Sequence, residues 1–240
     1  MTAVKKRGVV RKFWRLLLRG LLVACAALAL YEGSVLARIL WWRTHNPADT
    51  AMMRARLSEL RLKDPQAALT QVWVPYERIS PQLKRAIVAA EDAKFLSHEG
   101  FDWEGIQLAY EKNVRRGRIV AGGSTISQQL AKNLFLSRAR TPWRKAEEAL
   151  ITVMLEKTLE KRRILELYLN VIEWGERTFG AEAAARRHFG SSAAALSAEQ
   201  AARLAAMVPN PRYYERRGTT PFLTRQTAVI RARMTQVQVP

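Results

Sequence analysis

An uncharged run lies close to the N-terminus, directly after a basic flank. Seven Lys or Arg residues precede the run from Gly20 to Tyr31, and Glu32 is the first charge after it. These twelve residues are too few to span a bilayer, which needs about 20, but residues 13–18 extend the run if Arg15 and Arg19 snorkel to the headgroups. The pattern predicts a basic cytoplasmic tail over residues 1–12 and a transmembrane anchor over residues 13–33. A cleaved secretory signal is the alternative, although no clear small-x-small cleavage site follows Tyr31.

Beyond the anchor, apolar positions recur mainly at helical spacing. Combinations of Ser or Thr with Pro or Gln predict helix starts at residues 80–81, 125–128, 141–142 and 197–200. Further helices are expected over residues 50–62, 161–170, 181–189 and 221–234, an extended segment over 71–75, and a basic loop over 115–118. The pattern therefore predicts a mainly α fold with at most a short strand or two.

Charge and cysteine content narrow the setting of the domain. The formal net charge is +19, and the first 43 residues hold nine Lys or Arg and one Glu, so they contribute +8. This excess suits an anionic lipid surface. The sequence lacks zinc-ligand spacing, an aromatic RNA-binding motif and a dinucleotide fingerprint, which argues against nucleic acid as a partner. Cys25 is the only cysteine and falls in the predicted anchor, so an intramolecular disulfide is excluded.

The first candidate for chemistry is Glu91, which continues the apolar stripe of Leu83 and Ile87. A carboxylate on such a stripe is costly unless it is paired or useful, and its apolar neighbours are expected to raise its pKa. Glu91 is therefore the best candidate for a general base. The alternative is that Glu91 turns outward as its helix ends. Asp92 and His98 are expected to support it, and for His98 a structural hydrogen bond is favoured over direct proton transfer.

The second candidate is the glycine turn at residues 122–123 and the helix after it. A helix N-terminus with unpaired amides is an anion site, and Gln128, Gln129 and Lys132 are expected to add donors. An ordinary capped helix with a solvated face is the alternative.

Two later helices carry charged pairs one turn apart. Lys145 and Arg144 lie within a turn of Glu148, and Glu166 lies one turn before Asn170. Taken alone, the charged residues around Glu148 are best interpreted as a surface ion pair. Beside an anion site, Lys145 would bind phosphate and Glu148 would hold a cation or a leaving group.

Five ordered blocks make the chain resemble the peptidoglycan glycosyltransferases (glycosyltransferase family 51), and more narrowly the monofunctional biosynthetic transglycosylases. The blocks are Glu91-Asp92-x-x-Phe95-x-x-His98-x-Gly100, Gly123-Ser124-Thr125-Ile126-x-Gln128-Gln129-x-x-Lys132-Asn133, Arg144-Lys145-x-x-Glu148, Arg163-Ile164-Leu165-Glu166-x-Tyr168-Leu169-Asn170, and Gly180-x-x-x-Ala184-Ala185 through Phe189-Gly190. The match runs from about Val72 to Tyr214.

The resemblance implies a lysozyme-like catalytic lobe with a small jaw lobe. It divides the chain into a periplasmic connector (34–70), a glycosyltransferase domain (71–215) and a C-terminal helix or tail (216–240). It also implies that a single-pass protein of the inner membrane polymerises lipid II into β-1,4 glycan in the periplasm. The anomeric centre inverts and undecaprenyl pyrophosphate is released. Lipid II, the growing glycan-lipid chain and the membrane are the implied partners.

The resemblance also assigns roles by position. Glu91 takes the place of the catalytic base, and Glu148 that of a second acid that assists the leaving group, directly or through a divalent cation (Mg²⁺ or Mn²⁺). No organic cofactor is implied. The positions that match the donor pyrophosphate site are Ser124, Gln128, Gln129, Lys132, Arg144 and Lys145. The supporting positions are Asp92, Phe95, His98, Glu166 and Asn170.

The chain departs mildly from the family pattern at His188-Phe189, where Tyr-Phe is usual, and at Trp174-Gly175, where Phe-Gly is usual. The sequence holds no Ser-x-x-Lys tetrad, so we expect no transpeptidase activity and no acylation by penicillin. Two other hypotheses are a lytic enzyme on a related fold and a non-catalytic membrane scaffold that recruits division or elongation proteins. The cationic cluster argues against the first, and the intact Glu91 and Glu148 argue against the second.

Overall fold

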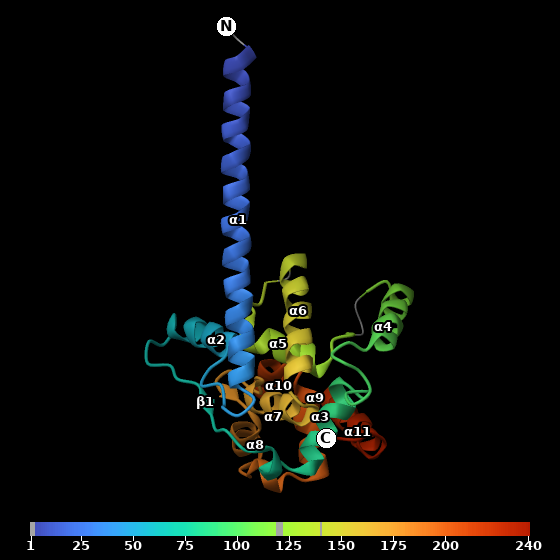
Figure 1. The fold of residues 1–240 in the computed structure, drawn as a ribbon. Coiled ribbons are helices and arrows are strands. Elements are labelled where there is room, and N and C mark those ends of the chain that lie inside the picture. The colour runs from blue at the N-terminus through green and yellow to red at the C-terminus, as the bar shows by residue number, and fades with distance from the viewer. Residues whose placement is uncertain (1–2, 119–121, 140) are drawn as a thin grey trace.

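A single long helix carries the N-terminal segment away from the rest of the protein. In the computed structural model, which describes residues 3–118, 122–139 and 141–240, α1 (Ala3–Trp41) stands out from the domain (Figure 1). Its part from Lys12 to Trp41 is long and apolar enough to cross a membrane by length and composition. The helix continues past residue 33, and Val35 and Ile39 are fully buried against the domain. The segment predicted as an anchor is therefore helical and joined rigidly to the domain.

The core of the domain is built from helices whose apolar faces meet around α7 (Lys161–Val171), where seven of eleven residues are buried. The helix α5 (Ile126–Phe135) packs against α7 and against α6 (Pro142–Thr158). On the other side, α9 (Ala198–Met207) packs against α3 (Pro81–Glu91) and α11 (Pro221–Arg233). The helices α2 (Ala51–Arg61), α8 (Ala181–Phe189) and α10 (Pro211–Arg217) also belong to the domain. The prediction of a mainly α fold is confirmed.

Most predicted helix starts are confirmed by their caps. Ser80, Thr141 and Thr220 each accept a backbone hydrogen bond at the start of a helix whose first residue is proline. Thr125 and Ser197 form complete capping boxes with Gln128 and Gln200. These starts were readable because a cap uses residues within one turn of each other.

Residues 115–118 correct one prediction. Arg115 and Arg116 form the last turn of α4 (Trp103–Arg116) instead of a loop, and Gly117 ends the helix in the left-handed region at φ +61°. Basic side chains favour the negative end of a helix and glycine favours this terminal conformation, so the same residues suit a helix end. The helix α4 has no buried residue and, with the N-terminal part of α6, projects to the same side as α1 (Figure 1). These projecting parts are where the small lobe implied by the resemblance would lie.

The expected extended segment at 71–75 is only partly a strand. The strand β1 (Thr70–Gln71) pairs in parallel with β2 (Thr178–Phe179). At Val74 the backbone instead bonds to the side chain of Asn170, which accepts from Val74 N at 2.8 Å and donates to Val74 O at 2.9 Å. Gly180 follows β2 at φ +80°, where a Cβ would lie 2.6 Å from Asn170 O, so only glycine fits.

Among the described residues, three short 3₁₀ helices lie between or after the longer elements: η1 (Tyr76–Arg78), η2 (Ala193–Ala195) and η3 (Met234–Gln236). The hydroxyl of Tyr76 donates to the backbone oxygen of Pro240, so the C-terminal end is held against the core near α3.

Candidate active site

Glu91 ends α3 with its carboxylate directed at α5. Gln129 Nε2 donates to Glu91 Oε2 at 2.8 Å, and Tyr168 Oη donates to Gln129 Oε1 at 2.9 Å. Burial raises the pKa of Glu91, and the charge of Asp92 adds to this, while the Gln129 hydrogen bond and Lys132 act in the opposite direction. The side chain thus neither turns outward nor loses its partners, and its carboxyl holds a proton more readily than an exposed glutamate does.

Asp92 holds the segment around Glu91 in place. Its Oδ2 accepts from Ile126 N at 3.0 Å, at the first turn of α5, and its Oδ1 lies 2.8 Å from His98 Nε2. Gly100 N donates to His98 Nδ1, so Nδ1 is an acceptor and Nε2 carries the proton that goes to Asp92. This geometry gives His98 the structural hydrogen bond that the sequence favoured. No hydrogen bond joins His98 to Glu91 in the part of the chain that the structure describes.

The predicted donors on α5 divide into two groups. Gln129 and Lys132 point towards the site, whereas Gln128 is buried and its Oε1 accepts from Thr125 N at 3.0 Å. This oxygen therefore serves the helix start, as the capping box requires. Ser124 is exposed just before the helix.

A buried carboxylate holds the cations of α6. Glu148 is only 3% exposed, and its Oε2 accepts from Arg144 Nη1 at 2.6 Å while its Oε1 pairs with Lys145 Nζ. These ion pairs therefore involve a buried carboxylate, and they are not the surface ion pair that the sequence alone suggested. Arg144 Nε is buried and has no hydrogen-bond partner among the described residues.

Lys132 interacts electrostatically with Glu91 and with the charged residues around Glu148. Burial lowers its pKa, and Arg144 and Lys145 act in the same direction, while Glu148 and Glu91 raise it. A cavity of about 430 Å³ is lined by Gln129, Lys132, Arg144 and Tyr168, among others. A cation that is partly stripped of water and faces a cavity suits an anionic ligand.

The remaining supporting residues are structural in this geometry. Phe95 is fully buried, and Lys161 Nζ lies 4.6 Å from its ring centroid. Glu166 accepts from Arg163 at 2.8 Å, and Arg163 in turn donates to the backbone oxygens of Trp42 and His45, just after α1. Asn170 fixes Val74 as described above.

The residues around Glu148 do not form a protein-held metal site. Both carboxylate oxygens face cationic side chains. Residues 3–118, 122–139 and 141–240 contain no group of three or more His, Cys, Asp or Glu that could hold a metal ion. A cation such as Mg²⁺ is commonly held by one or two carboxylates together with waters and substrate phosphates, so the Mg²⁺ or Mn²⁺ expected at Glu148 stays a prediction.

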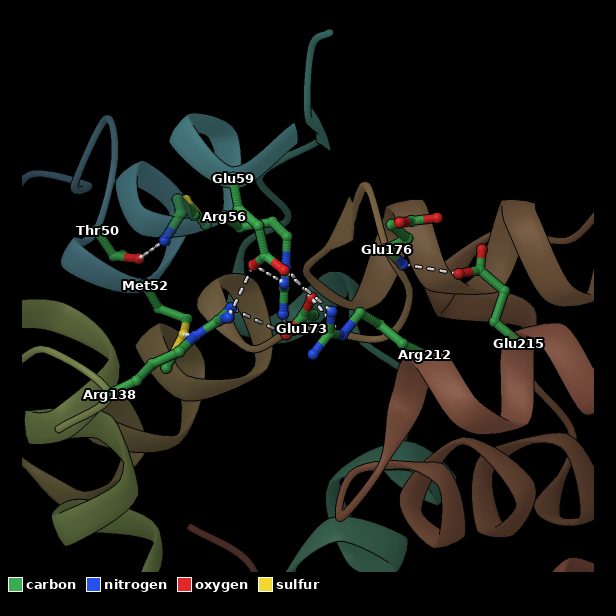
Figure 2. Close-up of polar contacts among 10 residues, drawn as sticks. Thr50, Met52, Arg56, Glu59, Arg138, Glu173, Glu176, Arg212 and Glu215 are labelled. Atoms are coloured by element: carbon green, nitrogen blue, oxygen red, sulfur yellow. Dashed lines mark hydrogen bonds and ion pairs between the residues drawn. The ribbon is translucent and has the colours of Figure 1, made fainter. Parts of the chain in front are cut away.

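Sequence reasoning missed a charged cluster, four of whose members line the same cavity. It consists of Arg56, Glu59, Arg138, Glu173 and Arg212, and we call it the arginine–glutamate cluster (Figure 2). Arg56 and Glu173 lie 117 positions apart in the sequence, so no local spacing joins them. Their charge was the only feature in the sequence that could have indicated the cluster. Many solvent-exposed residues are charged as well, so this feature does not single them out.

Comparison with known proteins decides the family. The transglycosylase family model matches residues 58–235, which is most of the chain. The biosynthetic peptidoglycan transglycosylase of Methylobacillus flagellatus is 61% identical over 228 residues, which cover 95% of this chain and 98% of that protein. The chain belongs to the monofunctional biosynthetic peptidoglycan transglycosylases.

Other members of the family support the same assignment. The transglycosylase of Chromobacterium violaceum is 59% identical over 94% of this chain and 99% of its own length, and that of Nitrosospira multiformis is 57% identical over 96% and 98%. Membership makes the protein a glycosyltransferase of peptidoglycan synthesis with a lysozyme-like helical fold.

Proposed function

We propose that this transglycosylase polymerises lipid II into β-1,4 glycan strands at the outer face of the inner membrane. The observation that carries the proposal is the hydrogen bond from Gln129 to Glu91, because Gln129 lines the same cavity as Lys132. A carboxylate with raised pKa therefore lies beside a cavity lined with cations. Displacement of a pyrophosphate by a sugar hydroxyl needs these two features together.

In the proposed reaction, Glu91 removes the proton from the 4-hydroxyl of the incoming lipid II GlcNAc. The oxygen attacks C1 of the reducing-end sugar of the growing chain, forming the new C–O bond as the bond from C1 to the pyrophosphate oxygen breaks. Attack from the opposite face converts the α-linked donor into a β-linked product. The electron pair leaves with undecaprenyl pyrophosphate, and the proton stays on Glu91 until solvent removes it.

The cations of the cavity would offset the charge on the leaving group. Lys132 and Arg144 line the cavity, and Lys145 shares Glu148 with Arg144. Glu148 then assists the leaving group through the two cations that it orients. This role fits the pairing of both its oxygens and requires no metal ion.

The long α1 suggests how the site meets its lipid substrate. We propose a single membrane span with the basic N-terminus in the cytoplasm and the catalytic domain in the periplasm. The burial of Val35 and Ile39 against the domain would hold the cavity at a fixed height above the membrane.

The experiment is polymerisation of fluorescent lipid II by the full-length protein in detergent. Wild type should give long, lysozyme-sensitive glycan, and Glu91→Gln should lose about 10²–10⁴-fold in rate, the usual contribution of a general base. Glu199→Gln is the matched control, because Glu199 is exposed and pairs with Arg231 on α11. Near-normal turnover by Glu91→Gln would refute the base assignment.

The alternative functions predict other results in the same experiment. If the protein is a scaffold, neither wild type nor Glu91→Gln will give polymer, and the Glu91→Gln variant will support growth as well as wild type does. A lytic enzyme would release short muropeptides from purified sacculi.

A further inference from the structure

The arginine–glutamate cluster has an excess of positive charge at a fixed place. Buried Arg56 donates to both oxygens of Glu173, from Nε at 2.6 Å and from Nη2 at 2.9 Å, and it also pairs with Glu59. This single guanidinium therefore satisfies much of what the two carboxylates can accept. Three arginines and two glutamates leave one positive charge over.

Arg138 and Arg212 are the loosely bound members of the cluster. Arg138 donates to Glu59 Oε2 at 3.0 Å, but its Nη2 is 4.0 Å from Glu173. The nearest approaches of Arg212 to Glu59 and Glu173 are 3.7 and 3.9 Å, which are longer than hydrogen bonds. Figure 2 shows the two arginines reaching the same carboxylates from opposite sides. The carboxylates thus orient two guanidiniums without occupying all of their donors.

Both arginines line the cavity that contains Lys132 and Arg144. Each side chain is 37% exposed, so a ligand in the cavity can reach it. The lining includes four further charged groups besides Arg138 and Arg212, and Glu173 is the only acid among the lining residues that the structure describes. Burial disfavours the charge of Glu59, but Arg56, Arg138 and Arg212 outweigh it and lower the pKa of Glu59, so this carboxylate stays ionised beside the arginines.

We propose that Arg138 and Arg212 form a second oxyanion subsite, which binds a carboxylate or phosphoryl group of the same substrate. Its arginines line the same cavity as Lys132 and Arg144, but Glu59 and Glu173 orient them, whereas Glu148 orients Arg144. The inference rests on the proposed function. Guanidinium groups match both kinds of oxyanion in shape and charge. Lipid II offers two sources: the carboxylates of its stem peptide and a phosphoryl group of its lipid pyrophosphate.

The test measures binding without turnover. The probe is fluorescent lipid II whose GlcNAc 4-hydroxyl is blocked, so that it cannot act as an acceptor, titrated with full-length protein in detergent. Arg138→Gln and Arg212→Gln should each raise Kd about tenfold, which is the loss of one charge-assisted contact, and Arg212→Lys should recover part of it. Arg231→Gln is the matched control, because Arg231 is an exposed arginine paired with Glu199 outside the cavity.

A second probe, with amidated stem-peptide carboxylates, distinguishes the two sources. If the carboxylates are the ligand, wild type binds this probe weakly and Arg212→Gln changes nothing further. If a phosphoryl group is the ligand, the tenfold effect persists.

The subsite is disproved if both glutamine variants bind the first probe as tightly as wild type does. It is also disproved if the variants bind more weakly only to the extent that they are less well folded, as judged by a lower melting temperature. That result would assign the arginines a purely structural role. The outcome is independent of the proposed polymerisation. If the protein makes no glycan but the arginine variants bind the probe more weakly, the subsite stands and the proposed function fails. If it makes glycan and the variants bind as wild type does, the function stands and the subsite fails.

Discussion

The amide of Gln129 links Glu91 to Tyr168, with its nitrogen on the carboxylate and its oxygen on the phenol. Burial and the nearby carboxylates of Glu91 and Asp92 raise the pKa of Tyr168, so its hydroxyl keeps its proton and donates. The donor on Tyr168 fixes which end of the amide faces Glu91. The amide therefore supports the charged form of the proposed base, against the effect of burial.

Replacing Gln129 is expected to shift the acidic limb of the pH–rate profile. Gln129→Met removes a hydrogen bond to ionised Glu91, which raises the pKa of Glu91 further. Because the base works only when ionised, the acidic limb of kcat/KM moves to higher pH. Tyr168→Phe should move it in the same direction by less. Gln107→Met, at an exposed position of α4, is the control, and an unmoved limb in Gln129→Met would contradict the linkage.

Lys132 is expected to set the basic limit of substrate binding. Burial lowers its pKa, so it loses its charge at lower pH than an ordinary lysine does. Arginine stays protonated throughout this range. In Lys132→Arg, the Kd of the blocked lipid II probe should therefore stay low to higher pH than in wild type, and in Lys132→Met binding should be weak at every pH. The same basic limb in all three proteins would exclude Lys132 as the titrating group.

Substitutions of His98 separate a structural role from proton transfer. His98→Ala leaves the buried Asp92 oxygen without its donor and should lower the free energy of unfolding by about 1–3 kcal/mol. His98→Gln can still donate to Asp92, so its turnover should stay within a few-fold of wild type. The measurements are thermal melting and polymerisation. A well-folded His98→Gln protein as inactive as Glu91→Gln would instead support direct proton transfer.

Arg56 is expected to be essential for stability. Arg56→Met leaves Glu173 largely buried without its bidentate partner, and breaking such a pair costs about 3–5 kcal/mol. Arg54→Met, on the same helix, removes only an exposed pair with Asp49 and should cost at most about 1 kcal/mol. Denaturant unfolding of both variants checks the difference, and similar midpoints would show that the Arg56 pair contributes little.

Two departures from the family pattern prove to be one feature of the packing. His188 Nε2 lies 2.9 Å from the backbone oxygen of Trp174, and the buried Trp174 donates from Nε1 to Leu204 O at 3.1 Å. In the sequence they appear fourteen positions apart as unrelated changes. The reversal of the chain between Trp174 and Thr178, followed by α8, brings them together, so the sequence did not reveal their coupling.

The sequence by itself determined what depends on neighbours within a turn or two. The anchor pattern, the caps at Ser80, Thr125, Thr141 and Ser197, and the order of the motif residues were all readable because these signals are local. The same locality misled at Arg115 and Arg116, where a basic run suits a helix end as well as a loop.

Tertiary structure alone decided which side chains share a site. It placed Gln129 against Glu91, whereas the adjacent and chemically identical Gln128 closes the local capping box with Thr125. It also placed Arg138 and Arg212 beside the cavity of Lys132. The physical reason is that burial and charge pairing depend on distances between segments that are far apart in the chain. Those distances are set by the packing of α2, α5, α7 and α10, and not by any spacing along the sequence.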